Sequence, residues 1–209
     1  MSEEELSKKQ VTRGFLILLI FILLRAAISK IEDDFLFLVG AFLIGSVGLV
    51  YLGFSKWVGI DLKRWWRFNK KEFVKDIGWG ILGFLICLFL MGIVIVSAIQ
   101  LGFVPKDATY STVSPASYLL SLFFGFAIAS FQEEIIFRGF LQDILKERFG
   151  IWRGNVLQAA VFSIAHIGYY PLDSWPFFLS AFLTGIVFGW LRIRRGTLFS
   201  SYIAHGILG

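Results

Sequence analysis

Long apolar runs dominate this chain and decide what it can fold into. Runs long enough to cross about 30 Å of hydrocarbon as helices occur at residues 11–28, 35–54, 77–103, 118–145, 156–167 with its flanks, and 177–193, and a seventh begins at Thr197. Apolar residues make up 57% of the 209, and the mean hydropathy of +0.75 exceeds that of an ordinary soluble domain. We predict an all-α, polytopic membrane helix bundle with about seven transmembrane helices.

Basic residues gather in short connections between these runs, which is the pattern that sets membrane orientation. Of the 20 Lys and Arg residues, only Arg25, Lys30 and Lys106 fall in connections on the side opposite to the N-terminus. This predicts a multi-pass protein of the cell membrane with a cytoplasmic N-terminus. It also indicates that the basic surface meets membrane lipids and not nucleic acid. No cleavage site follows the first run, so the first helix is expected to remain as an anchor.

Two features of the chain suggest how it is divided. The stretch 105–115 clusters Pro, Asp, Thr and Ser between apolar runs, so we expect three N-terminal transmembrane helices in residues 1–115 and a four-helix catalytic core in residues 116–209. Residues 55–75 combine three Trp with seven Lys or Arg, which is typical of an interfacial helix on an anionic leaflet. The single Cys87 excludes a disulfide framework and a cysteine metal site.

Charged residues inside the fourth run point to chemistry. Glu133 and Glu134 are adjacent, and Arg138 follows within the same apolar helix. A charge at the bilayer centre costs about 2.5 to 3.5 kcal/mol even on the milder scales, so such residues are usually paired and functional. Glu134 and Arg138 have the i, i+4 spacing of an intrahelical ion pair. We therefore expect Arg138 to neutralise Glu134, which leaves Glu133 without a permanent partner.

The two histidines of the chain fall at matching depths. Glu133 and His166 lie equally far from a turn predicted at Phe149 and Gly150, so an antiparallel hairpin would bring them to one level in the membrane. His205 approaches the same level from the last helix. Glu133 with His166 could activate a water molecule, and His205 could donate a hydrogen bond to a developing oxyanion. The alternative is a buried polar network that only fixes helix packing.

The spacing of these residues resembles the CAAX protease and bacteriocin-processing family, which includes the type II CAAX prenyl endopeptidases. That family is marked by Glu-Glu-x-x-x-Arg, Phe-x-x-x-His and His-x-x-x-Asn, and the matching residues here are Glu133, Glu134 and Arg138, then Phe162 and His166, then His205. The resemblance covers about residues 116–209.

The resemblance implies intramembrane endoproteolysis of a small hydrophobic or lipidated peptide, reached from the cytoplasm or laterally from lipid. Glu133 and His166 would activate water, Glu134 and Arg138 would orient the site, and His205 would stabilise the tetrahedral intermediate. It favours a metal-free glutamate mechanism with no cofactor, although one Glu and two His could also ligate zinc. Gly209 stands where the family has Asn, and the last helix is short, so a truncated or altered form with weak or no activity is one expectation.

Three other classes compete with this hypothesis. Serine, metallo- and aspartyl intramembrane proteases are disfavoured, because the chain has no Gly-x-Ser-Gly, His-Glu-x-x-His or Gly-x-Gly-Asp. A transporter or proton relay would also bury Glu, Arg and His, but the inverted repeats that would support it are missing. A non-catalytic immunity or scaffold protein that retains the site stays open. The sequence indicates neither the substrate's prenylation nor the oligomeric state.

Overall fold

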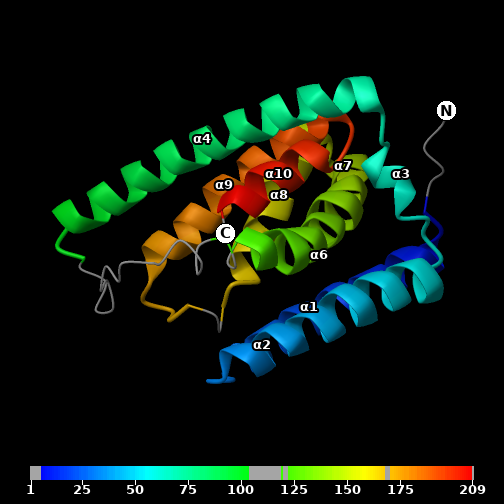
Figure 1. The fold of residues 1–209 in the computed structure, drawn as a ribbon, viewed down its shortest axis with the longest axis horizontal. Coiled ribbons are helices and arrows are strands. Elements are labelled where there is room, and N and C mark those ends of the chain that lie inside the picture. Colours follow the sequence, from blue (N-terminus) through cyan, green and yellow to red (C-terminus); the bar gives the residue numbers. More distant parts are fainter. Residues whose placement is uncertain (1–5, 104–118, 120–121, 168–169, 209) are drawn as a thin grey trace.

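The computed structural model describes residues 6–103, 119, 122–167 and 170–208, and the regular structure in this part of the chain is helical. These residues include no strand; Ile167 and Tyr170 form an isolated bridge. The prediction of an all-α fold is therefore confirmed. Figure 1 shows an N-terminal helical hairpin, a long helix α4, and a central group of helices between them.

The N-terminal hairpin consists of two long helices. The first is α1 (Lys8–Ile28), and the second joins α2 (Asp34–Gly40) to the π-helical stretch η1 (Ala41–Val58). The side chains of Ser7 and Asp33 accept hydrogen bonds from backbone N–H groups in the first turns, which is the usual way a helix start is capped. Both helices thus begin at a sequence signal, directly before an apolar run.

The basic segment 55–75 connects the hairpin to the long helix. The structure divides it among the end of η1, the short helix α3 (Lys63–Trp66) and the start of α4 (Lys70–Gln100), so it is not one continuous helix. Trp65 is 1% exposed and packs in the protein core. Its carbonyl accepts a hydrogen bond from the N–H of Leu198. This segment is therefore anchored to the C-terminal part of the protein as well as being rich in positive charge.

The central group contains the residues that the sequence singled out. Four consecutive stretches form one helix, which we call the central helix (125–149): η2 (Gly125–Ser130), α6 (Phe131–Glu133), η3 (Glu134–Leu141) and α7 (Gln142–Phe149). It is followed by α8 (Ile151–Ile164), α9 (Trp175–Arg195) and α10 (Phe199–Leu208). Gly150 separates the central helix from α8 with a φ of 87°, which confirms the predicted turn.

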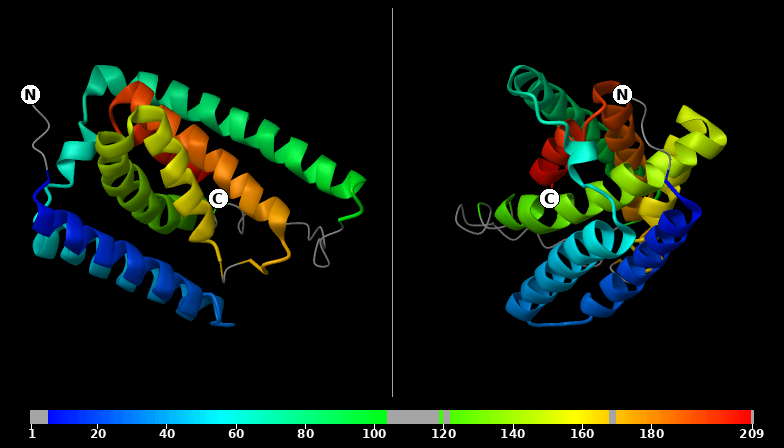
Figure 2. Two further views of the ribbon diagram at one scale, coloured as in Figure 1. Left: turned by 180° about the vertical axis from the view of Figure 1, so that it is seen from behind. Right: turned by 90° about the vertical axis from the view of Figure 1, so that its right-hand side faces the viewer.

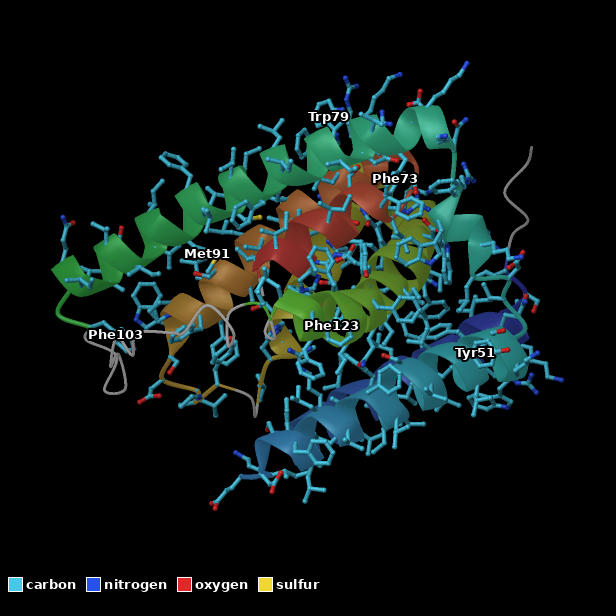
Figure 3. The ribbon with its side chains drawn as sticks, in the orientation of Figure 1. Tyr51, Phe73, Trp79, Met91, Phe103 and Phe123 are labelled. Atoms are coloured by element: carbon cyan, nitrogen blue, oxygen red, sulfur yellow. The ribbon has the colours of Figure 1, made fainter. Side chains whose placement is uncertain are left out.

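Two apolar cores hold these groups together. The larger one joins α1 and η1 to the central helix, and the smaller one joins α4 to α9 and α10. Figure 2 shows the hairpin and α4 on opposite sides of the central group. Figure 3 shows side chains filling the space between the hairpin and the central helix, with Phe123 near the start of that helix. The central helix is thus covered by the hairpin on one side.

The number of membrane spans is only partly established. Four helices in the described part of the chain are long and apolar enough to cross a membrane: Lys8–Ile28, Phe35–Val58, Lys70–Gln100 and Trp175–Arg195. The predicted count of seven is not confirmed. Helices α8 and α10 have 14 and 10 residues, fewer than the approximately 20 that a spanning helix needs. The central helix is long enough but carries several charged residues.

Candidate active site

The two adjacent carboxylates are buried inside the helix bundle. Glu133 is 2% exposed and Glu134 is fully buried. Successive residues of a helix point about 100° apart, so the two side chains leave the helix in different directions. Glu134 Oε1 lies 3.3 Å from Arg138 Nη1, which confirms the predicted i, i+4 ion pair. Glu133 instead turns toward α1.

Arg138 combines this ion pair with aromatic contacts. Its guanidinium carbon lies 4.1 Å from the ring centre of Phe162 and 5.1 Å from that of Phe188. The side chain is completely buried, and none of its three nitrogens makes a hydrogen bond within the described residues. The Glu134 carboxylate and the aromatic faces therefore supply the compensation for burying this charge.

His205 connects the two carboxylates. Its Nδ1 lies 2.9 Å from Glu134 Oε1, and its Nε2 lies 3.4 Å from Glu133 Oε2. The imidazole stacks on the ring of Phe188, with ring centres 4.8 Å apart. These contacts fix the orientation of the ring. The prediction that the last helix brings His205 to the level of the glutamates is confirmed.

His166 lies two residues beyond the end of α8. Its Nδ1 is 2.8 Å from the carbonyl oxygen of Phe162, which can only accept, so Nδ1 carries the proton of this hydrogen bond. In the neutral ring, Nε2 is then left with a lone pair and can accept a proton. The ring of Tyr170 lies parallel to His166 at 6.0 Å between centres. His166 is therefore a fixed imidazole with one basic nitrogen.

Phe162 lies at the centre of this arrangement. Its ring centre is 4.9 Å from that of His166 and 5.9 Å from that of His205, and both contacts are edge-to-face. The same ring carries the Arg138 guanidinium. A single aromatic side chain thus spaces the two imidazoles and shields the cation. Within the described residues, His166 bonds through Nδ1 to Phe162 and Glu133 Oε2 makes no hydrogen bond, so no direct hydrogen bond joins His166 to Glu133.

The expectation that Glu133 has no permanent partner is wrong. Arg25, in the last turn of α1, forms an ion pair with Glu133 Oε1 through Nη1. The sequence predicts Arg25 in a connection at the membrane surface, because this residue lies near the end of an apolar run. The available signal was its isolation, since it is the single Lys or Arg between Gly14 and Ile28.

The cluster therefore contains two carboxylates and two guanidinium groups from two different parts of the chain. The five residues on which the sequence prediction rested, Glu133, Glu134, Arg138, His166 and His205, do gather in one place. Gly209, the departure from the family pattern, lies outside the described residues. Within the described part of the chain, no three His, Cys, Asp or Glu side chains are arranged to hold a metal ion.

The comparison with known families found a match, which covers the stretch that contains most of this site. Residues 115–208 match the family model of the type II CAAX prenyl endopeptidase Rce1-like proteins. This C-terminal part, slightly less than half of the chain, is similar to that family. The match contains the central helix, α8, α9 and α10, and with them all the predicted site residues, whereas Arg25 lies outside it. Comparison with curated proteins and with solved structures gave no match. Together with the apolar helices, the Rce1-like match supports a membrane-bound hydrolase.

Proposed function

We propose that this protein is an intramembrane endopeptidase that hydrolyses a peptide bond in a small hydrophobic or lipidated substrate, including CAAX-prenylated peptides. The observation that carries the proposal is the meeting of Glu133, Glu134 and His205 with Arg138 inside an apolar bundle. Buried ionisable groups at membrane depth are costly and are usually retained for function. The Rce1-like match makes peptide hydrolysis the reaction class that fits them best.

The mechanism begins with a water molecule between Glu133 and His166. Glu133 Oε2 makes no hydrogen bond within the described residues, and His166 Nε2 keeps its lone pair. Oε2 would take a proton from the water while the water oxygen attacks the carbonyl carbon of the peptide bond. As the carbon–nitrogen bond breaks, the same proton would pass to the leaving amine. No covalent intermediate with the protein is required.

The remaining residues stabilise and orient. His205 Nε2 lies beside Glu133 Oε2. Because Nδ1 donates to the Glu134 carboxylate, Nε2 carries a hydrogen only when the ring is doubly protonated, and in that form it would donate to the oxyanion of the tetrahedral intermediate. Glu134 holds His205 through Nδ1 and is itself held by Arg138. Phe162 fixes the distance between the imidazoles. In this proposal Glu134, Arg138 and Phe162 are positioning residues and do not touch the reacting atoms.

We propose that the reaction needs no metal. A zinc ion held by Glu133, His166 and His205 would have to displace the Arg25 guanidinium from Glu133 or share the carboxylate with it, and it would lie close to a positive charge. A mechanism with Glu133 as the general base needs no change in the ion pair between Arg25 and Glu133. Metal dependence is open to direct measurement with a chelator.

We also propose the membrane arrangement that the sequence predicts. The N-terminus would face the cytoplasm, and the central helix, α8 and α10 would lie within the hydrocarbon beside the four long helices, giving seven membrane helices. Residues 116–209 would form the catalytic core behind three N-terminal helices, with the basic segment 55–75 against lipid headgroups. Substrate would enter from the cytoplasmic side or laterally from lipid.

The test is cleavage of fluorogenic prenylated and unprenylated peptides by the purified protein in lipid. Glu133→Gln should abolish cleavage, and Glu147→Gln, an exposed change on the same helix, should leave it unchanged. Cleavage that survives a chelator supports the metal-free mechanism, and loss restored by zinc refutes it. A folded Glu133→Gln variant that still cleaves would refute the role of this residue. A panel that no form cleaves would favour a non-catalytic scaffold.

A further inference from the structure

We propose that Arg25 is a positioning residue for Glu133, so that the N-terminal hairpin is a working part of the site and not only a membrane anchor. The proposal uses the role of Glu133 in the proposed function. It goes beyond that function because Arg25 and the hairpin lie outside the Rce1-like match. Three independent features of the structure support it.

The first feature is the way α1 packs against the central helix. A Cβ atom at Gly14 would lie 2.0 Å from the ring of Phe140, so only glycine permits this close approach. Further along α1, the rings of Phe21 and Phe137 meet edge-to-face at 6.1 Å. The next contact is the ion pair of Arg25 with Glu133. As the residue number along α1 rises from 14 to 25, the number of the contacted residue on the central helix falls from 140 to 133. The two helices therefore run antiparallel, with contacts along their shared length.

These contacts fix where the guanidinium can be. Positions 14, 21 and 25 are spaced by seven and four residues, which places them on one face of a helix. Because the same face carries the glycine contact, the aromatic pair and the arginine, α1 cannot rotate without losing all three. The side chain of Arg25 is 20% exposed and that of Glu133 is 3% exposed. The cation therefore reaches inward from the edge of the bundle to a buried acid.

The second feature is that η1 holds the residue next to Glu133. Gln132 donates through Nε2 to the Ala41 carbonyl at 2.8 Å and to Ser46 Oγ at 3.0 Å. A Cβ atom at Gly45 would lie 2.0 Å from Gln132 Oε1, so this contact is also close. The two helices of the hairpin thus hold two consecutive residues of the central helix. If the hairpin served packing alone, it would not need polar contacts to both Gln132 and Glu133.

The third feature is the balance of charge. Arg138 pairs with Glu134, and its charge reaches Glu133 only from further away. Two adjacent buried carboxylates with one cation would tend to share a proton, which would block Glu133 from accepting one from water. Arg25 supplies the second cation. The other groups facing Glu133 are His205 from α10 and His166 beyond α8.

Arg25 also distinguishes the two oxygens of Glu133. The Arg25 guanidinium pairs with Glu133 Oε1, while Glu133 Oε2 lies beside His205 Nε2. One oxygen is thus committed to the ion pair, and the other is left for proton transfer. The orientation that the proposed mechanism requires follows from this division.

The decisive experiment measures the protonation of Glu133 without any substrate. Dicyclohexylcarbodiimide, an apolar reagent, reacts with protonated carboxyl groups, and mass spectrometry of peptides from the protein in lipid at neutral pH locates the product. Arg25→Gln should raise labelling of Glu133 at least about tenfold, and Arg25→Lys should restore most of the protection because it keeps the charge. Arg13→Gln is the matched control, since Arg13 lies on α1 but donates to the Trp57 carbonyl.

Turnover gives a second readout. Arg25→Gln should lower kcat about a hundredfold, the size expected for loss of a general base, with KM changed less than threefold. If Arg25→Gln does not fold, Gly14→Ala replaces it, because the added methyl group pushes α1 off Phe140 and leaves Arg25 in the sequence. That variant should also label faster at Glu133.

The outcomes separate this inference from the proposed function. Glu133 labelling that stays at the wild-type rate in folded Arg25→Gln, or in Gly14→Ala if the former does not fold, overturns the inference whatever the enzyme does. Increased labelling in Arg25→Gln, with protection in Arg25→Lys and Arg13→Gln, supports it even if no peptide in the panel is cleaved, because labelling requires no substrate. In that case the failure concerns the proposed peptidase activity alone.

Discussion

Replacing Arg138 with Met should destabilise the protein more than any other single change in the site. Met keeps much of the side-chain volume but removes the charge, so Glu134 is left as a buried carboxylate whose ion-pair partner is gone. Breaking a buried pair in this way costs about 3 to 5 kcal/mol. Loss of the cation over the rings of Phe162 and Phe188 adds about 1 to 2 kcal/mol.

The charge contribution can be separated by a double-mutant cycle with Glu134→Gln. Gln keeps an oxygen that can accept from His205 Nδ1 but carries no charge. The double variant should therefore recover about 2 to 3 kcal/mol relative to Arg138→Met alone, because replacing both members of a buried pair is often close to neutral. The free energy of unfolding would be measured in mixed micelles with increasing anionic detergent.

The control for this cycle is Arg148→Met. Arg148 is an exposed residue near the end of the central helix, with its guanidinium over one ring at 5.9 Å, and its loss should change stability by less than about 0.5 kcal/mol. An Arg138→Met variant that loses less than about 1 kcal/mol would contradict the burial of the Glu134 charge. A double variant as unstable as the single one would assign the loss to aromatic packing and not to the ion pair.

Three further changes test other parts of the structure. His205→Gln should lower kcat about 100- to 1000-fold with little change in KM, as for loss of an oxyanion donor, measured by steady-state peptide cleavage. Trp65→Phe removes the indole donor to Asp143 Oδ2 at 3.0 Å and should cost about 1 to 3 kcal/mol; thermal unfolding compared with the exposed Trp152→Phe checks it. Gly209→Asn should raise kcat about tenfold or more if the family amide is needed for the oxyanion, and an unchanged kcat would show that it is not.

Much of the site could be predicted from the sequence because helices convert spacing into depth. Glu133 and His166 are equidistant from the turn at Gly150, so the prediction that they share one level required only a rise per residue and a hairpin. The pair of Glu134 with Arg138 required only the i, i+4 rule. Both predictions are properties of one helix or of two helices joined by a short turn.

The direction in which side chains point around each helix could not be predicted in the same way. Depth does not say which neighbour a residue faces, and that depends on packing between elements far apart in the chain. Arg25 and Glu133 are 108 residues apart, and their meeting rests on the glycine and phenylalanine contacts of α1. For the same reason, the docking of Trp65 against Asp143 does not follow from a segment whose composition resembles an interfacial helix.

The short length of α8 explains how His166 reaches the middle of the bundle. Fourteen helical residues extend about 21 Å, less than the approximately 30 Å of hydrocarbon, so in the proposed membrane arrangement a helix that started at the interface would end inside the hydrocarbon. The backbone beyond α8 must then be satisfied within the protein. His166 N–H donates to the Ser163 carbonyl, and the His166 carbonyl accepts from Tyr170.

In the proposed membrane arrangement, the last helix reaches the site in the same way. Helix α10 begins at Phe199, and His205 lies six residues later, about 9 Å along the axis. A helix of full spanning length would continue past the level of the glutamates, whereas the short helices α8 and α10 place His166 and His205 near that level. The two short helices α8 and α10 therefore deliver the histidines, and the long helices α1 and α4 lie on opposite sides of them. Lengthening α8 by one turn would move His166 about 5 Å away from Glu133 and should abolish activity while the fold persists.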